Sequence, residues 1–124
     1  MLKDRDAMAT IAVRTLATAK KFYGGTLGLA PQQEGPGVVT YRSGLSSLVV
    51  YQSEFAGTNR ATAATWGLGS EFDAVVVSLR QAGIRFEHYE LPGLQRDGDV
   101  HSAGTFKAAW FRDPDGNILH VNNG

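Results

Sequence analysis

The sequence contains no cysteine, no long hydrophobic run and no excess of charge of either sign. Without cysteine the chain can form neither a disulfide framework nor a thiolate metal site. Its apolar stretches are far shorter than the roughly 20 residues that cross a bilayer. Its 12 basic and 12 acidic residues cancel, so no net field attracts nucleic acid or an anionic membrane. We therefore expect a cytoplasmic protein that binds small molecules or a second copy of itself, and neither nucleic acid nor membrane.

The length and composition are those of one globular domain. Of the 124 residues, 43% are hydrophobic, which is enough to bury a core without disulfides. We expect a single domain over residues 1–124, built from two similar modules at 8–53 and 63–122.

Each module has the pattern strand, helix and three strands. In the first, an alternating strand precedes Thr15, a favourable N-cap for an amphipathic helix. In the second, Ser70 and Asp73 form a capping-box pattern ahead of another helix. After this second helix we expect a strand at 84–89 and then the closing hairpin. Residues 91–104 are interpreted as an inserted loop, and loops of this kind often cover binding sites.

The closing hairpin is the most informative stretch of the sequence. Pro114 presets the first corner of a type I turn, Asp113 can accept backbone N–H bonds, and Gly116 supplies a left-handed residue. Beyond the turn, side chains alternate along the strand, so Leu119 and His120 fall on opposite faces. One face is suited to a core, and the other can face a ligand.

Two motifs resemble those of the vicinal oxygen chelate superfamily, which includes glyoxalase I, bleomycin-resistance proteins and ring-cleaving dioxygenases. They are Phe22-Tyr23 followed by Leu27-Gly28-Leu29, and Phe111-Arg-Asp-Pro-Asp-Gly-Asn117. The resemblance implies an α+β fold in which two βαβββ modules form a cup-shaped, half-open mixed sheet with helices on the outside. The superfamily supports several reactions on one scaffold, so the residues of the cup must decide the function.

Metal-using members of this superfamily carry one His, Glu or Gln on each of four strands of the cup. The resemblance maps these positions onto Met8, Val49 or Val50, Ala63 or Ala64, and His120. Only His120 has a side chain that can coordinate a hard divalent cation, and such a site needs three or more protein ligands. We therefore predict no metal and no other cofactor. A divalent metal at a site rebuilt from His120, His101 and a carboxylate is the alternative.

Without a metal, the cup is expected to bind a ligand directly. The predicted ligand-binding residues are Met8, Thr10, Val49, Tyr51, Trp110, Ile118 and His120. Tyr51 would supply a hydroxyl anchor, and His120 would orient the ligand or act as the catalytic base near its ordinary pKa of about 6.5. His101 and Arg96 in the inserted loop are expected to be solvated, or to contact an anionic ligand from a lid.

The leading hypothesis is a homodimeric protein, related to glyoxalase and bleomycin-resistance proteins, that binds a small apolar or aromatic molecule in a metal-free cup. One alternative is a metal-dependent lyase, isomerase or dioxygenase of the glyoxalase type. Another is a metal-free acid–base enzyme that uses His120. A dimer that binds no ligand is a third possibility.

Overall fold

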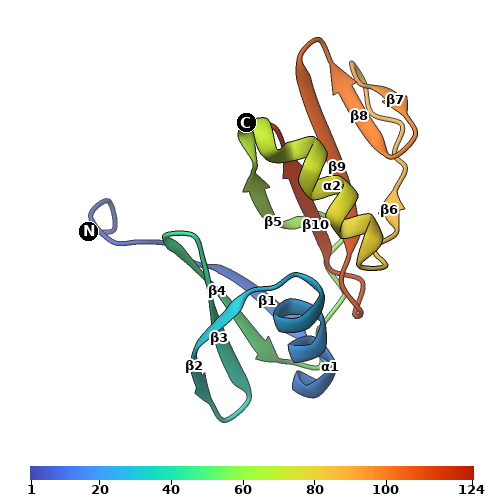
Figure 1. The fold of residues 1–124 in the computed structure, drawn as a ribbon. Coiled ribbons are helices and arrows are strands. Elements are labelled where there is room, and N and C mark those ends of the chain that lie inside the picture. The colour runs from blue at the N-terminus through green and yellow to red at the C-terminus, as the bar shows by residue number, and fades with distance from the viewer.

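Two β-sheets, one from each half of the chain, form the framework of the computed structural model, which describes residues 1–124 (Figure 1). The first sheet has the order β1-β4-β3-β2. Its strands are β1 (Ala9–Val13), β2 (Ala30–Gly35), β3 (Val38–Ser43) and β4 (Ser46–Gln52). β1 runs parallel to β4, and the other neighbours are antiparallel. This is the order expected when a helix connects the first strand to a three-strand meander.

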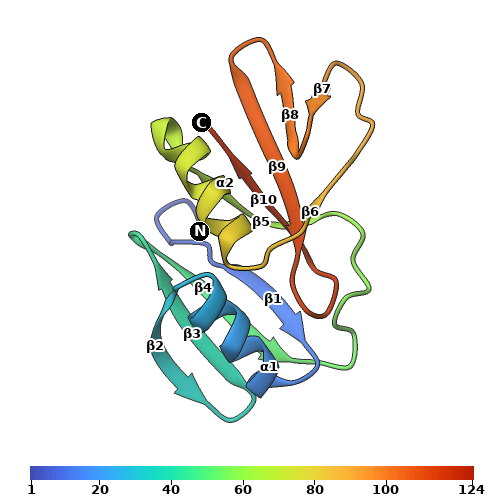
Figure 2. The same cartoon turned by 45° about the vertical axis from the view of Figure 1, so that its right-hand side comes forward.

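The second sheet repeats this arrangement and extends it. Its strand order is β5-β10-β9-β8-β7, and β6 also pairs with β9. The strands are β5 (Thr62–Gly67), β6 (Phe86–Glu87), β7 (Gln95–Asp97), β8 (Val100–Ala103), β9 (Phe106–Arg112) and β10 (Ile118–Asn122). β5 is parallel to β10, as β1 is to β4. The two sheets meet where β1 and β5 lie next to each other (Figure 2).

The inserted segment differs from the expected loop. The strand predicted at 84–89 is reduced to β6, and residues 91–104 contain the β7–β8 hairpin. Two short strands form here because β9 is long enough for both β6 and β8 to pair with it. Phe86 of β6 pairs with Phe111, whereas His101 of β8 pairs with Ala108. Together the short strands cover an edge that would otherwise present unpaired N–H and C=O groups.

The helices begin as expected, but the predicted side-chain caps do not form. α1 (Leu16–Lys20) follows Thr15, continues as a π-helix, η1 (Lys21–Thr26), and has no side-chain cap. α2 (Phe72–Gln81) follows a 3-10 turn, η2 (Gly69–Glu71), which contains Ser70. The capping-box prediction was wrong because Ser70 lies inside η2 and Glu71, not Ser70, is the residue before α2. The carboxylate of Asp73 instead accepts two 3.1 Å bonds from Lys107 Nζ on β9.

One hydrophobic core joins both halves of the chain. It contains 19 buried residues, among them Ile11 and Val50 of the first sheet and Phe111 and Leu119 of the second. The helices cover this side of the sheets and leave the opposite faces open. The expected α+β fold is therefore confirmed: two βαβββ-type modules form an open cup with helices outside. None of the helices is long and apolar enough to span a membrane.

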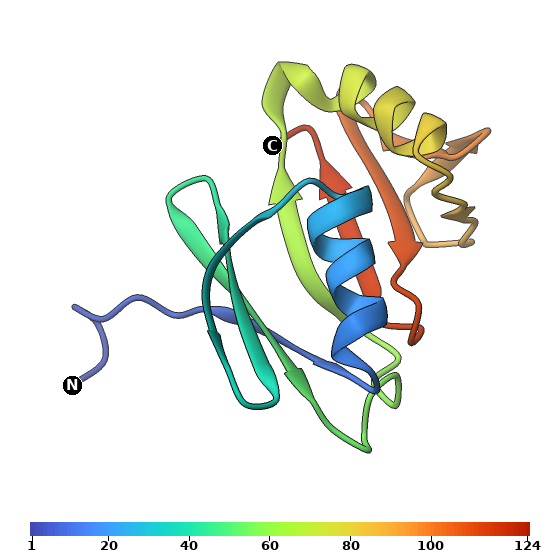
Figure 3. The ribbon, with the colours of Figure 1, turned by 60° about the horizontal axis from the view of Figure 1, so that its bottom comes forward.

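The closing turn forms as predicted and also links the two halves. Asp113 Oδ1 accepts hydrogen bonds from the amides of Asp115 at 2.9 Å and Asn117 at 2.8 Å, and Gly116 has φ +89°. Asn117 Nδ2 donates a 2.8 Å bond to the carbonyl of Ala12 on β1. Figure 3 shows this turn, between β9 and β10, beside the helix that begins as α1.

Candidate ligand-binding site

The open face of the first sheet carries four of the predicted ligand-binding residues. Thr10 on β1 is the register partner of Val49 on β4, and Tyr51 follows two residues later on the same face. Met8 lies just before β1 and is 53% exposed. The alternative position Val50 is completely buried in the core, so Val49 is the residue that faces the cup.

The open face of the second sheet carries the other three predicted residues. Trp110 on β9 lies directly opposite His120 on β10. Their rings stack with centroids 4.4 Å apart and planes inclined by 26°. Ile118 lies on the same face, two residues before His120. On β5, Ala64 is buried in the core and Ala63 is half-buried.

His120 forms hydrogen bonds through both ring nitrogens. Nδ1 lies 3.1 Å from the carbonyl oxygen of Ala109, and Nε2 lies 3.2 Å from Asn122 Nδ2. A carbonyl can only accept and an amide nitrogen can only donate. The imidazole is therefore neutral, with its proton on Nδ1. Burial lowers the pKa of His120 below its ordinary 6.5, although the Ala109 carbonyl opposes this. In this arrangement His120 supports the Trp110 ring, and its catalytic role stays a prediction.

Two further aromatic rings pack against Trp110. His101 packs against it edge to face at 5.0 Å, and Tyr89 does so at 5.6 Å. His101 is 0% exposed, so the expectation that this residue is solvated was wrong. It lies on β8, and its Nε2 accepts a 2.9 Å bond from the Tyr89 amide. Arg96 is exposed and bonds only the Gly98 carbonyl within the β7–β8 hairpin.

A cavity of about 440 Å³ opens beside the exposed part of Trp110. It is lined by Arg60, Ala61, Thr62, Tyr89, Leu91, Trp110, Arg112 and Ile118. Trp110 and Ile118 are thus the predicted ligand-binding residues that the fold brings to this cavity. Met8, Thr10, Val49 and Tyr51 lie on the other sheet and do not line it. His120 lies behind Trp110 as its support.

The polar residues that line this cavity were not predicted from the sequence. Arg112 could have been found, because it alternates with Trp110 along β9 and so shares its face. Arg60 and Thr62 carry no such signal, since they lie in and just after the segment that connects the two sheets. Their place in the cavity depends on how this connection packs beside β10.

The two arginines that line the cavity differ in whether a carboxylate compensates their charge. Arg112 Nε is paired with the Glu87 carboxylate, and Nη1 donates a 3.1 Å bond to the Gly116 carbonyl. The bond to Glu87 is the main reason that the pKa of Arg112 is raised. Arg60 forms no salt bridge, and no carboxylate lines the cavity. The lining therefore has a net positive charge.

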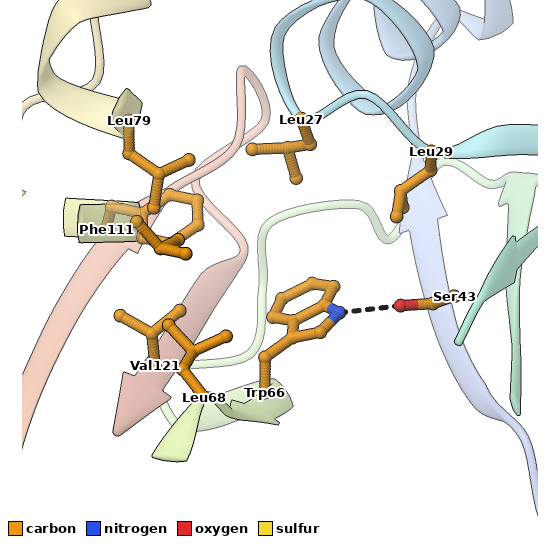
Figure 4. A pocket seen from close by; sticks show the side chains of 9 residues that line it. Leu27, Leu29, Ser43, Trp66, Leu68, Leu79, Phe111 and Val121 are labelled. Atoms are coloured by element: carbon orange, nitrogen blue, oxygen red, sulfur yellow. Dashed lines mark hydrogen bonds between the residues drawn. The ribbon is translucent and has the colours of Figure 1, made fainter. Parts of the chain in front are cut away.

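A second cavity, of about 190 Å³, lies on the helix side between the two halves (Figure 4). It is almost entirely apolar, lined by Leu27, Leu29, Ser43, Trp66, Leu68, Val75, Leu79, Phe111 and Val121. Trp66 points into it and donates a 2.8 Å hydrogen bond to Ser43 Oγ. Small-molecule sites combine apolar walls with a few polar groups that fix orientation. The polar groups here already bond each other, so we assign the candidate site to the cavity beside Trp110.

Comparison with known proteins places this fold. A family model described as the Glyoxalase/Bleomycin resistance protein/Dioxygenase superfamily matches residues 7–121. The chain belongs to this superfamily. This agrees with the resemblance noted in the sequence. A comparison with curated proteins finds no match.

Solved structures of this superfamily share the fold at low sequence identity. A glyoxalase/bleomycin resistance protein/dioxygenase from Alicyclobacillus acidocaldarius is 21% identical, with a TM-score of 0.72 over 98% of this chain and 93% of that one. A glyoxalase family protein from Enterococcus faecalis is 20% identical, with a TM-score of 0.72 over 98% and 99%. The fosfomycin resistance protein FosX from Listeria monocytogenes, complexed with Mn(II) and sulfate, is 12% identical, with a TM-score of 0.71 over 100% and 92%.

The residues of this superfamily member do not fit a divalent metal. Its four mapped positions carry Met8, Val49, Ala63 and His120, and both nitrogens of His120 are already bonded within the protein. No group of three or more His, Cys, Asp or Glu side chains that could hold an ion occurs in the chain. The alternative of a site rebuilt from His120, His101 and a carboxylate therefore has no support in the geometry. The absence of a cofactor stays a prediction.

Proposed function

We propose that this protein binds a small aromatic molecule against Trp110, without the help of a metal ion. The observation that carries the proposal is the fixed orientation of the indole beside an open cavity. One face of the ring stacks on His120 at 4.4 Å, and Nε1 donates a 3.3 Å bond to Thr62 Oγ1.

A fixed aromatic wall favours binding because it is ordered before the ligand arrives. Ordering a flexible side chain on binding costs about 0.5–1.5 kcal/mol. Tyr89 and His101 pack edge to face against the indole, which limits its alternative rotamers further. Offset stacking between a ligand ring and an indole adds attraction beyond the apolar area that it buries.

We further propose that the protein is a homodimer in the cytoplasm and that the first sheet contributes to the cup through this dimer. Met8 and Tyr51 are large apolar side chains that are 53% and 40% exposed on one open sheet face. A second copy packed over this face would bury them and enclose the cavity. Sedimentation velocity tests this, because Tyr51→Glu should convert a dimer to a monomer.

The binding proposal is tested by NMR of the two indole N–H groups. The chain has two tryptophans, so Trp110 reports the candidate site and Trp66 reports the helix-side cavity. We expect aromatic compounds in a fragment screen to shift the Trp110 signal and to raise the melting temperature, as any ligand of the native state does. Trp110→Leu should abolish binding. Hits that shift only the Trp66 signal would contradict the proposal.

Catalysis by His120 is the second candidate function. Its neutral imidazole has the protonation state that a general base requires. Before it could take a proton from a substrate, however, Asn122 would have to release Nε2. A substrate whose turnover is lost in His120→Gln and retained in Asn122→Ala would support this alternative.

A further inference from the structure

The charged side chains that line the cavity beside Trp110 are both hydrogen-bond donors only, Arg60 and Arg112. Thr62 and Tyr89 contribute hydroxyl groups, the Tyr89 hydroxyl being buried, and the remaining lining residues are Ala61, Leu91, Trp110 and Ile118. A guanidinium has five N–H donors and no acceptor. No Asp, Glu, Asn or Gln side chain is present in the lining to accept a bond from a ligand.

Thr62 behaves as a donor toward the cavity even though a hydroxyl can play both roles. Its oxygen already accepts the 3.3 Å bond from the indole N–H of Trp110. Its own O–H forms no hydrogen bond within the protein. This proton is therefore available to an oxygen atom of a ligand that lies against the indole.

The two arginines differ in how far their charge is compensated. Arg112 bonds both the Glu87 carboxylate and the Gly116 carbonyl. Arg60 has no carboxylate partner and no hydrogen bond within the protein. At the cavity, the carboxylate of Glu87 compensates the charge of Arg112, and the charge of Arg60 has no counter-charge. Hydrogen bonds between an ionised donor and an ionised acceptor are about twice as strong as neutral ones.

We infer that the ligand of this cavity is an aromatic acid, whose ring packs on Trp110 and whose carboxylate accepts hydrogen bonds from Arg60 and Thr62. This inference rests on the proposed function, because it names the chemical class of the molecule bound at that site. A neutral aromatic ligand can offer an acceptor oxygen to Arg60 or Thr62, but it leaves the charge of Arg60 uncompensated and forms only the weaker kind of hydrogen bond. A cationic ligand would meet the uncompensated charge of Arg60.

The test compares two probes of the same shape, 2-naphthoate and 2-naphthamide, by calorimetry and by the indole N–H signals. We expect 2-naphthoate to shift the Trp110 signal and to bind about tenfold more tightly, since one charge-assisted bond accounts for a factor of this size. Its affinity should fall as salt is added, because the guanidinium is exposed and its field is screened. The affinity of 2-naphthamide should not change with salt.

Variants test which residue gives the preference for 2-naphthoate over 2-naphthamide. Arg60→Gln should weaken 2-naphthoate about tenfold and leave 2-naphthamide unchanged, whereas Arg60→Lys should retain most of the affinity. Arg42→Gln is the matched control, because Arg42 is also exposed and unpaired but lies on β3, outside the cavity. Thr62→Val should reduce the preference for the acid further.

The outcomes separate this inference from the proposal on which it rests. Equal affinity for the two probes, with a shifted Trp110 signal in both cases, would overturn the preference for an acid and leave aromatic binding intact. No shift of Trp110 with either probe would overturn both. An equal loss of 2-naphthoate affinity in Arg42→Gln and Arg60→Gln would show that only long-range charge acts, and would also overturn the role of Arg60.

Discussion

The hydroxyl of Tyr23 donates a 2.7 Å hydrogen bond to Oδ2 of Asp113, which joins the helical segment of the first half to the closing turn of the second. The same carboxylate oxygen accepts a 2.8 Å bond from Asn117 Nδ2. Burial, followed by the negative charge of Asp113, raises the pKa of Tyr23 far above its ordinary value. The phenol therefore stays protonated and acts as the donor at neutral pH.

Removal of this hydroxyl should weaken the link between the two halves. Tyr23→Phe leaves one buried carboxylate oxygen with a single donor, and we expect a loss of about 2 kcal/mol, as is typical of hydrogen bonds to charged groups. Urea unfolding measures the change. Tyr41→Phe is the matched control, because Tyr41 is equally buried but its hydroxyl forms no hydrogen bond within the protein. Equal losses in both variants would mean that the bond to Asp113 adds nothing.

A second contact with the closing turn depends on Gly57. A Cβ atom at this position would lie 2.0 Å from the carbonyl oxygen of Asp115, and Gly57 also has φ +74°. Gly37 has almost the same φ, +73°, but no atom lies within 4 Å of its Cβ position. Gly37→Ala should therefore cost only the backbone strain, about 1 kcal/mol. Gly57→Ala should cost clearly more, because the backbone of the turn must also move.

Thermal unfolding of these two alanine variants checks the prediction. A lower melting temperature for Gly57→Ala than for Gly37→Ala would show that the connection between the sheets packs tightly on the closing turn. Equal melting temperatures would mean that the segment around Gly57 adjusts freely, in which case the position of Arg60, three residues later, would not be fixed either.

Local chemistry made much of the fold predictable. The turn at Asp113–Asn117 forms as expected because Pro114, Gly116 and Asp113 each favour it within five residues. The alternation of side chains along the last strand is also a local pattern, and it correctly placed Leu119 in the core. His101 was misassigned because it is buried on a strand, β8, that pairs with β9 as well as with β7, and the pairing with β9 is a contact that the segment itself does not encode.

The candidate site was predicted in part for a related reason. Trp110 and Ile118 lie on strands whose alternation identifies the open face, so both were found. Whether Val49 or Val50 faces that side required the exact register of β4. Arg60 belongs to a connection without periodicity, and its neighbours in space come from β9 and from the segment that follows β6. The sequence therefore predicted an aromatic wall but not the charge beside it.

Tyr89 offers a test of the aromatic cluster in the free protein. Its hydroxyl is buried and has no hydrogen-bond partner, and burial, followed by the charge of Glu87, raises its pKa. An unpaired buried hydroxyl costs about 1–3 kcal/mol. Tyr89→Phe removes this group and keeps the ring against Trp110, so we expect unchanged or increased stability in urea. A loss of more than about 1 kcal/mol would instead indicate that the hydroxyl bonds the nearby Arg112 guanidinium.

The pKa of His120 predicts how stability depends on pH. Burial holds this pKa below its ordinary 6.5, so the unfolded chain binds the proton more tightly than the folded one. The free energy of unfolding should therefore be highest above pH 6.5 and should fall as the pH decreases below that value. Asp99, whose pKa is lowered mainly by its bond to His88, affects stability only near and below its ordinary 3.8.

His120→Phe keeps a ring beneath Trp110, and its unfolding free energy should depend less on pH between 7 and 5. An equally steep dependence in this variant would assign the effect to another group.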